Sequence, residues 1–220
     1  GVLVVAALAV AASAGVVSSA GRAFEGLSAG RLDTENFLRS GSLDGVTSRP
    51  DLLLLQDLRD AAQLVVDHRG PIDADFVCDV NRAISRSGAL HPGRLRTPDQ
   101  RIGVSTRYGR HTPAALTEGG LQQLIDTALS GSDVREDSLD LFVNLAKAQP
   151  FEDGNKRTAI FAANALLIDA GAATLLTIPV DDPGLADTFN TLLAAAYVHG
   201  EHDGVKDLLR THGLVARNSE

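Results

Sequence analysis

The chain contains no methionine or tryptophan, one cysteine and only three lysines among its 220 residues. A single thiol, Cys78, excludes a disulfide within the chain. The formal net charge is −8, so the chain lacks the surplus of cations with which general nucleic-acid binders neutralise phosphate, and we expect no nucleic-acid partner. Aromatic residues make up 4% and hydrophobic residues 44% of the chain. Because small apolar side chains let helices approach closely, this composition favours a helical core.

The longest apolar run, residues 2–17, lies near the N-terminus. It is shorter than the roughly 20 residues that a membrane-spanning helix needs, and no basic residue precedes it, as one would in a signal peptide. We expect a buried helix here, with a signal-peptide core or a membrane anchor as the alternative. We therefore predict a cytoplasmic protein without a membrane partner.

Apolar residues at helical spacing predict a mainly α fold. The expected helices cover residues 51–66, 73–85, 116–129, 138–148, 155–170, 187–199 and 201–209. Residues 94–113 differ, because they are rich in Arg, Thr, Gly and Pro and alternate from Ile102 to Arg107, which predicts a short hairpin. Residues 177–180 could be a further extended segment, although Pro179 weakens this interpretation. A loop at residues 40–50 divides the chain into an N-terminal helical segment, 1–49, and a main domain, 50–215.

The run Gln149-Pro-Phe-Glu-Asp-Gly-Asn-Lys-Arg157 separates two of these helices. Pro150 does not fit inside the first helix, and Gly154 lets the backbone approach a ligand closely. The first N–H groups of the second helix have no partners within the helix, so its start attracts anions. Lys156 and Arg157 oppose the helix dipole there, and a bound di- or triphosphate would explain their presence. The alternative is an ordinary polar loop with solvated charges.

Two further residues of the run support a ligand site. Asp153 supplies a hard oxygen ligand beside the phosphates, which suits Mg²⁺ because this ion prefers one or two carboxylates together with phosphate oxygens. Phe151 is apolar within a polar loop, and we expect it to anchor the loop in the core.

The run resembles the signature of the Fic/Doc (Fido) family, His-Pro-Phe-x-Asp/Glu-Gly-Asn-Gly/Lys-Arg, with eight of nine positions compatible. The resemblance implies a Fic/Doc-like helical bundle with a small β-hairpin flap. It also implies an enzyme that uses ATP and Mg²⁺ to transfer AMP to a hydroxyl side chain of a target protein, or the terminal phosphate in Doc-type relatives. A nucleotide, a target protein and an antitoxin are the partners that it implies.

Carried over position by position, the resemblance assigns Mg²⁺ binding to Asp153 and the anchor to Phe151. The residues that would cradle the phosphates are Gly154, Asn155, Lys156 and Arg157. The flap that would align the target by strand pairing comprises Ile102, Gly103, Val104, Ser105 and Thr106. Arginines surround this hairpin and would contact either solvent or the nucleotide and target: Arg94, Arg96, Arg101, Arg107 and Arg110.

The first motif position holds Gln149, where the family has the His that accepts the proton of the attacking hydroxyl. General-base catalysis contributes about 10²–10⁴-fold, whereas an amide can only orient a nucleophile or a water. Three interpretations remain open: a transferase with weak or altered activity, a nucleotide-binding or protein-interaction module without transfer activity, or an engineered substitution.

Two other departures bear on the activity. Ile160 occupies the position of a second arginine found in many AMP-transferring relatives, which together with Lys156 favours Doc-like phosphoryl transfer. Residues 18–26 resemble the family's autoinhibitory helix, but Gly21 stands where the motif needs Ser or Thr four residues before Glu25. The spacing therefore favours an ordinary helix end.

Overall fold

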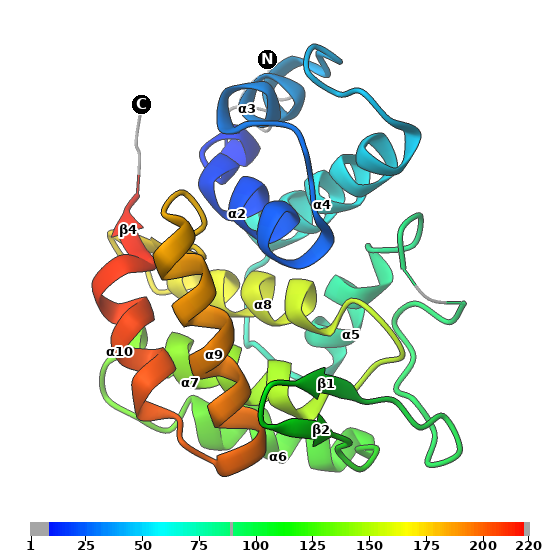
Figure 1. Ribbon diagram of the computed structural model, residues 1–220, viewed down its shortest axis with the longest axis vertical. Coiled ribbons are helices and arrows are strands. Elements are labelled where there is room, and N and C mark those ends of the chain that lie inside the picture. Colours follow the sequence, from blue (N-terminus) through cyan, green and yellow to red (C-terminus); the bar gives the residue numbers. More distant parts are fainter. Residues whose placement is uncertain (1–8, 89, 218–220) are drawn as a thin grey trace.

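The computed structural model describes residues 9–88 and 90–217. The mainly α prediction is confirmed, because helices make up most of this part of the chain (Figure 1). The helices are α2 (Ala14–Glu25), α3 (Arg31–Ser40), α4 (Arg49–Asp67), α5 (Ala74–Arg82), α6 (Glu118–Ala128), α7 (Val134–Ala148), α8 (Asn155–Asp169), α9 (Pro183–His199) and α10 (Asp203–His212). The strands are β1 (Val104–Thr106), β2 (Gly109–His111), β3 (Thr174–Leu176) and β4 (Leu214–Ala216).

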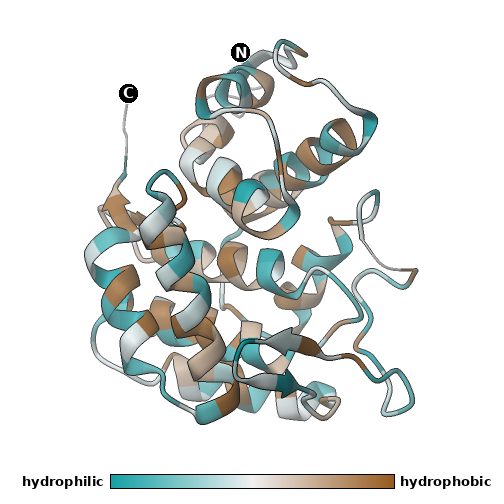
Figure 2. Ribbon diagram, viewed as in Figure 1, coloured by the Kyte–Doolittle hydropathy of each residue, from teal (hydrophilic) through white to brown (hydrophobic). Residues whose placement is uncertain are grey.

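Helix α8 lies at the centre of the molecule, in contact with α2, α4, α5, α7 and β3 (Figure 1). Its middle turns are buried all round, and the alanines Ala159, Ala162 and Ala163 let the neighbouring helices approach. The outer helices are amphipathic instead, as Figure 2 shows by the alternating colours of α10, which buries Val205 and Leu209. The loop that leads into α8 at Asn155 is therefore attached to a helix that neighbouring elements surround.

The N-terminal apolar run contributes to this core. Within it, Val16 and Val17 in α2 are buried, whereas residues 2–8 lie outside the described residues. No helix in the described part of the chain combines the length and apolar character needed to cross a membrane. Helix α3 was not predicted, because most of its residues are polar and only Thr34, Phe37 and Leu38 are buried.

The predicted hairpin forms from β1 and β2, which pair antiparallel with Val104 opposite His111. Within the predicted flap, residues 102–106, the strand starts at Val104, and Ile102 and Gly103 lead into it without ladder pairing. Residues 177–180, for which the sequence left an extended segment open, form no strand. Strand β3 ends at Leu176 and pairs with β4, which no sequence pattern indicated.

Candidate phosphate-binding site

Gln149 ends α7 in the left-handed conformation, with φ 46° and ψ 61°, and is the only non-glycine residue with positive φ in the described part of the chain. Such a conformation costs a residue with a Cβ about 1–2 kcal/mol, so the surroundings must hold it. Arg96, itself 3% exposed, donates from Nε to the Gln149 carbonyl at 2.7 Å and from Nη2 to the Pro113 carbonyl at 2.7 Å. Arg96 thus fixes the first residue of the loop and is not free to contact a nucleotide.

The next part of the loop closes on itself. The side-chain amide of Asn155 accepts from the N–H of Phe151 at 2.9 Å and donates to the Phe151 carbonyl at 2.9 Å. Phe151 is 1% exposed and lies in the core. The Asn155 side chain is therefore occupied within the loop, and only its backbone N–H is placed to meet a ligand.

The start of α8 differs from that of most other helices. A side chain caps α4, α5, α6, α7 and α9, each through a Ser, Thr or Asp at the N-cap. Gly154 occupies the N-cap of α8 with φ 75°, and no side chain of a described residue caps this helix. An uncapped helix start carries unsatisfied N–H groups and a partial positive charge, which together attract anions.

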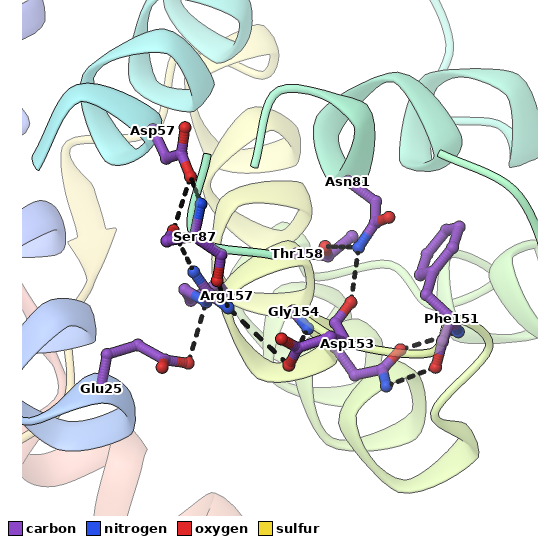
Figure 3. A network of polar contacts seen from close by, with 10 residues as sticks. Glu25, Asp57, Asn81, Ser87, Phe151, Asp153, Gly154, Arg157 and Thr158 are labelled. Carbon is purple, nitrogen blue, oxygen red and sulfur yellow. Dashed lines mark hydrogen bonds and ion pairs between the residues drawn. The ribbon is translucent and has the colours of Figure 1, made fainter. Parts of the chain in front are cut away.

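Asn81 of α5 holds the loop from the other side (Figure 3). Its side-chain amide donates to the carbonyl of Asp153 at 2.9 Å and to Oγ1 of Thr158 at 3.1 Å. A Cβ at Gly154 would lie 3.2 Å from the same nitrogen, closer than ordinary van der Waals contact. Glycine is thus favoured at 154 both by the positive φ and by the approach of Asn81.

Arg157 is almost fully buried, with 1% of its side chain exposed. Its Nη1 donates to Ser87 Oγ at 3.0 Å, and Ser87 Oγ in turn donates to Asp57 Oδ2 at 2.5 Å (Figure 3). Asp57, on α4, is 0% exposed and also accepts from the backbone N–H of Ser87 at 2.7 Å. A buried guanidinium is thereby connected to a buried carboxylate through one hydroxyl group.

The last turn of α2 covers the two cations of the loop. Glu25 Oε1 lies 3.0 Å from Arg157 Nε, an ion pair without hydrogen-bond geometry. The ammonium of Lys156 lies 5.8 Å from the centre of the Phe24 ring. Burial raises the pKa of the Glu25 carboxyl more than Arg157 lowers it, and burial lowers the pKa of Lys156. Glu25 therefore reaches the motif arginine, although its sequence context favoured an ordinary helix end.

The loop, α2 and the hairpin together line a cleft of about 250 Å³, with Gln149, Asp153 and Gly154 on one wall and Ile102 to Val104 on another. Lys156 also lines a neighbouring groove of about 290 Å³ between β1 and α9, whose wall includes Asn190 and Thr191. A larger cavity, about 660 Å³, lies beside α2 and β4 and includes no residue of the loop. We place the candidate site in the first cleft because the chemistry of the loop faces it.

Asp153 is the candidate Mg²⁺ ligand, and its donor set fits that role. Its side chain is 53% exposed, and Oδ1 accepts from the Gly154 N–H at 2.7 Å. No group of three His, Cys, Asp or Glu residues that could hold a metal exists in the described part of the chain. A Mg²⁺ ion here would therefore depend on Asp153 and on phosphate oxygens, which matches the preference of this ion.

The structure places five of the predicted loop residues along the cleft with the start of the hairpin: Gln149, Asp153, Gly154, Asn155 and Lys156. Phe151 and Arg157 are each 1% exposed and do not line it. The structure also adds three residues that sequence reasoning missed: Asp57, Asn81 and Ser87. Asn81 lies on α5 and Ser87 in the segment that follows it, each 70 or more residues from its partner in the α8 region. Asp57 lies on α4, 30 residues from Ser87. No local pattern in the sequence marks them.

Fold and loop define a class: a mainly helical domain in which a central helix that starts after a glycine meets a hairpin over a polar cleft. The model of the Fic/DOC family matches residues 71–167, which include α5, the hairpin, α7 and most of α8. The resemblance recognised from the motif is therefore confirmed by a family model that covers 97 of the 220 residues. No curated protein matches the sequence.

Solved structures share the fold. A segment of Fic-1 from C. elegans matches with a TM-score of 0.65 and 18% identity, over 89% of this chain and 58% of that one. A Fic domain containing signaling protein from Bacteroides thetaiotaomicron matches with a TM-score of 0.65 and 16% identity, over 91% and 82% of the two chains. The BepC protein of Bartonella tribocorum, solved with bound AMPPNP, matches with a TM-score of 0.50 and 17% identity, over 78% and 90%. At these identities the likeness concerns the fold.

Proposed function

We propose that this chain is a Fic-type transferase domain that binds ATP at the start of α8 and modifies a hydroxyl side chain of a target protein, slowly because of Gln149. The observation that carries the proposal is the uncapped start of α8, where Lys156 and Arg157 add two cations to a helix end that already attracts anions. The AMPPNP bound to the similarly folded BepC protein supports a nucleotide as the ligand.

Each part of the cleft has a role in this proposal. Mg²⁺ held by Asp153 would neutralise charge on the phosphates. The hairpin is two strands wide, so an outer edge is available for pairing with an extended target segment. Because Lys156 lines both the cleft and the β1–α9 groove, a nucleotide whose phosphates meet α8 could extend into that groove.

Gln149 limits the chemistry. Gln149 lines the cleft, and its amide could orient the attacking hydroxyl but cannot accept a proton near neutral pH. Ile160, at the position of the second arginine, is 0% exposed in the core and offers no further cation to the phosphates. Transfer of the terminal phosphate is therefore favoured over AMP transfer, and a nucleotide-binding module without transfer activity is the second candidate, supported by Gln149.

Helix α2 is part of the proposed function as an inhibitory element. Phe24 covers Lys156 and Glu25 occupies the outer side of Arg157, so a phosphate can reach this arginine only when Glu25 leaves. The contact resembles autoinhibition in the family but engages the first arginine of the motif, since the second is Ile160.

The proposal is tested by labelling a cell lysate with ATP carrying ³²P on either the α or the γ phosphate. We expect weak labelling by the parent protein and an increase of about 10²–10⁴-fold for Gln149→His, because histidine restores the general base. Label from the γ position alone would identify phosphoryl transfer. Gln123→His, an exposed glutamine on α6, is the matched control and should behave as the parent.

Binding is measured separately by calorimetry with ATP and Mg²⁺. Arg157→Ala should abolish measurable binding or weaken it strongly, because it removes a cation that is held at the helix start. If neither the parent nor a Glu25→Gln variant binds ATP at millimolar concentration, the proposed function is wrong. Binding without labelling in Gln149→His would select the second candidate.

A further inference from the structure

We propose that Ser87, oriented by the buried Asp57, is the positioning residue for Arg157, and that it keeps the guanidinium aimed at the nucleotide phosphates when Glu25 leaves. The inference rests on the proposed nucleotide function, and it adds a residue pair outside the motif to that site. The evidence is the chain of contacts from Asp57 through Ser87 to Arg157 (Figure 3).

The carboxylate of Asp57 is fully engaged. It is 0% exposed and accepts from the backbone N–H of Ser87 at 2.7 Å, from Ser87 Oγ at 2.5 Å and from the backbone N–H and Nη1 of Arg86 at 3.2 and 3.1 Å. A buried carboxylate with four donors is held firmly, since losing any of them would leave charge unsatisfied in the core. Asp57 is thus a rigid reference point for the segment that carries Ser87.

The direction of the Ser87 hydroxyl follows from this arrangement. Its single proton is donated to Asp57, so only its lone pairs remain to face Arg157, and Nη1 donates to them at 3.0 Å. The backbone carbonyl of Ser87 accepts from Nη2 of Arg157 at 3.5 Å. One edge of the guanidinium is therefore fixed by two acceptors on a single residue.

A hydroxyl is better suited to this task than a carboxylate would be. A carboxylate in place of the Ser87 hydroxyl would pair with Arg157 at hydrogen-bond distance, closer than Asp153 Oδ1 at 3.8 Å from Nη2, and would compete with a phosphate for its charge. Asp57 instead supplies its compensating negative charge indirectly, through the Ser87 hydroxyl. On the Nε side of Arg157, a phosphate oxygen can then replace Glu25. The inner contacts of Arg157 can then remain the same in both states while the outer partner changes.

The test compares Ser87→Ala with Ser85→Ala, an exposed serine in the same segment that makes no hydrogen bond through its side chain within the described residues. Both are made in a Glu25→Gln background so that the cleft is accessible, and affinities for Mg²⁺–ATP and for adenosine are measured by calorimetry. We expect Ser87→Ala to weaken ATP binding about tenfold, as for loss of a hydrogen bond to a charged group, without changing adenosine binding. Ser85→Ala should change neither, and Ser87→Thr, which keeps the hydroxyl, should restore ATP binding.

A second readout separates this inference from the function on which it rests. Exchange of the Arg157 Nη–H protons with water, followed by ¹⁵N NMR in the same background, should be slow in the parent and in Ser85→Ala and at least about tenfold faster in Ser87→Ala, because Nη1 and Nη2 are the groups that donate to Ser87. If none of these proteins binds ATP but the difference in exchange is observed, the proposed nucleotide function is wrong and the positioning role of Ser87 stands. Equal ATP affinities or equal exchange in Ser87→Ala and Ser85→Ala would overturn the positioning role.

Discussion

Two of the carboxylates near Arg157, those of Asp57 and Glu25, differ in almost every physical respect (Figure 3). The third, Asp153, lies with Oδ1 3.8 Å from Nη2. Asp57, on the inner side, is 0% exposed, accepts four hydrogen bonds and acts through Ser87. Glu25, on the outer side, is 34% exposed and makes an ion pair that lacks hydrogen-bond geometry. A buried and fully bonded acid serves structure, whereas a partly solvated acid with one partner can be exchanged for a ligand.

The largest expected effect is on the inner side. Asp57→Ala leaves Ser87 and the backbone N–H groups of two residues without an acceptor, and we expect a loss of about 3–5 kcal/mol in unfolding free energy. Asp60→Ala is the matched control, because Asp60 lies on the same helix and pairs with the same Arg86 at 2.7 Å but is 42% exposed. It should cost at most about 1 kcal/mol. Urea unfolding measures both, and equal losses would contradict the distinction between buried and solvated acids.

A smaller effect is expected on the outer side. Glu25→Gln removes a competitor for Arg157, so affinity for Mg²⁺–ATP should rise about two- to fivefold, in line with the modest strength of partly solvated ion pairs. Stability should change little. Glu35→Gln, which breaks an ion pair with Arg39 on α3, is the control and should leave ATP affinity unchanged. Unchanged affinity in Glu25→Gln would mean that α2 does not restrict access to the arginine.

The sequence predicted the residues of the loop better than the residues from distant segments that hold the loop in place. Gly154, Lys156 and Arg157 could be identified because local rules apply to them: a glycine at a turn and cations where the helix dipole opposes them. The predicted helices from residue 51 onward have counterparts for the same reason, since their apolar residues repeat along one face.

The supports could not be predicted because they depend on contacts between distant segments. Arg96 is one of five arginines near the hairpin, and nothing in its neighbourhood distinguishes the one that becomes buried against Gln149. Asp57 lies in a helix rich in leucine and resembles a solvated residue such as Asp60. The pairing of β3 with β4 likewise joins segments about 40 residues apart, each only three residues long.

The smallest expected effect is the dependence of stability on pH through Glu25. Burial raises its pKa above the ordinary value of about 4.5, so in the window just above pH 4.5 the folded protein keeps a proton that the unfolded chain has released. Stability from this group is then fully present below pH 4.5 and is lost as the pH rises through the raised pKa.

Between pH 4.5 and 7 we therefore expect the parent to lose more stability than Glu25→Gln, as measured by urea unfolding at a series of pH values. The difference should be small, because solvent screens a side chain that is about one-third exposed. If the parent instead gained stability relative to Glu25→Gln, attraction to Arg157 would outweigh the cost of burying Glu25. Glu25 would then hold α2 firmly against Arg157. It would differ from Asp57 in its position, but a ligand would not readily replace it.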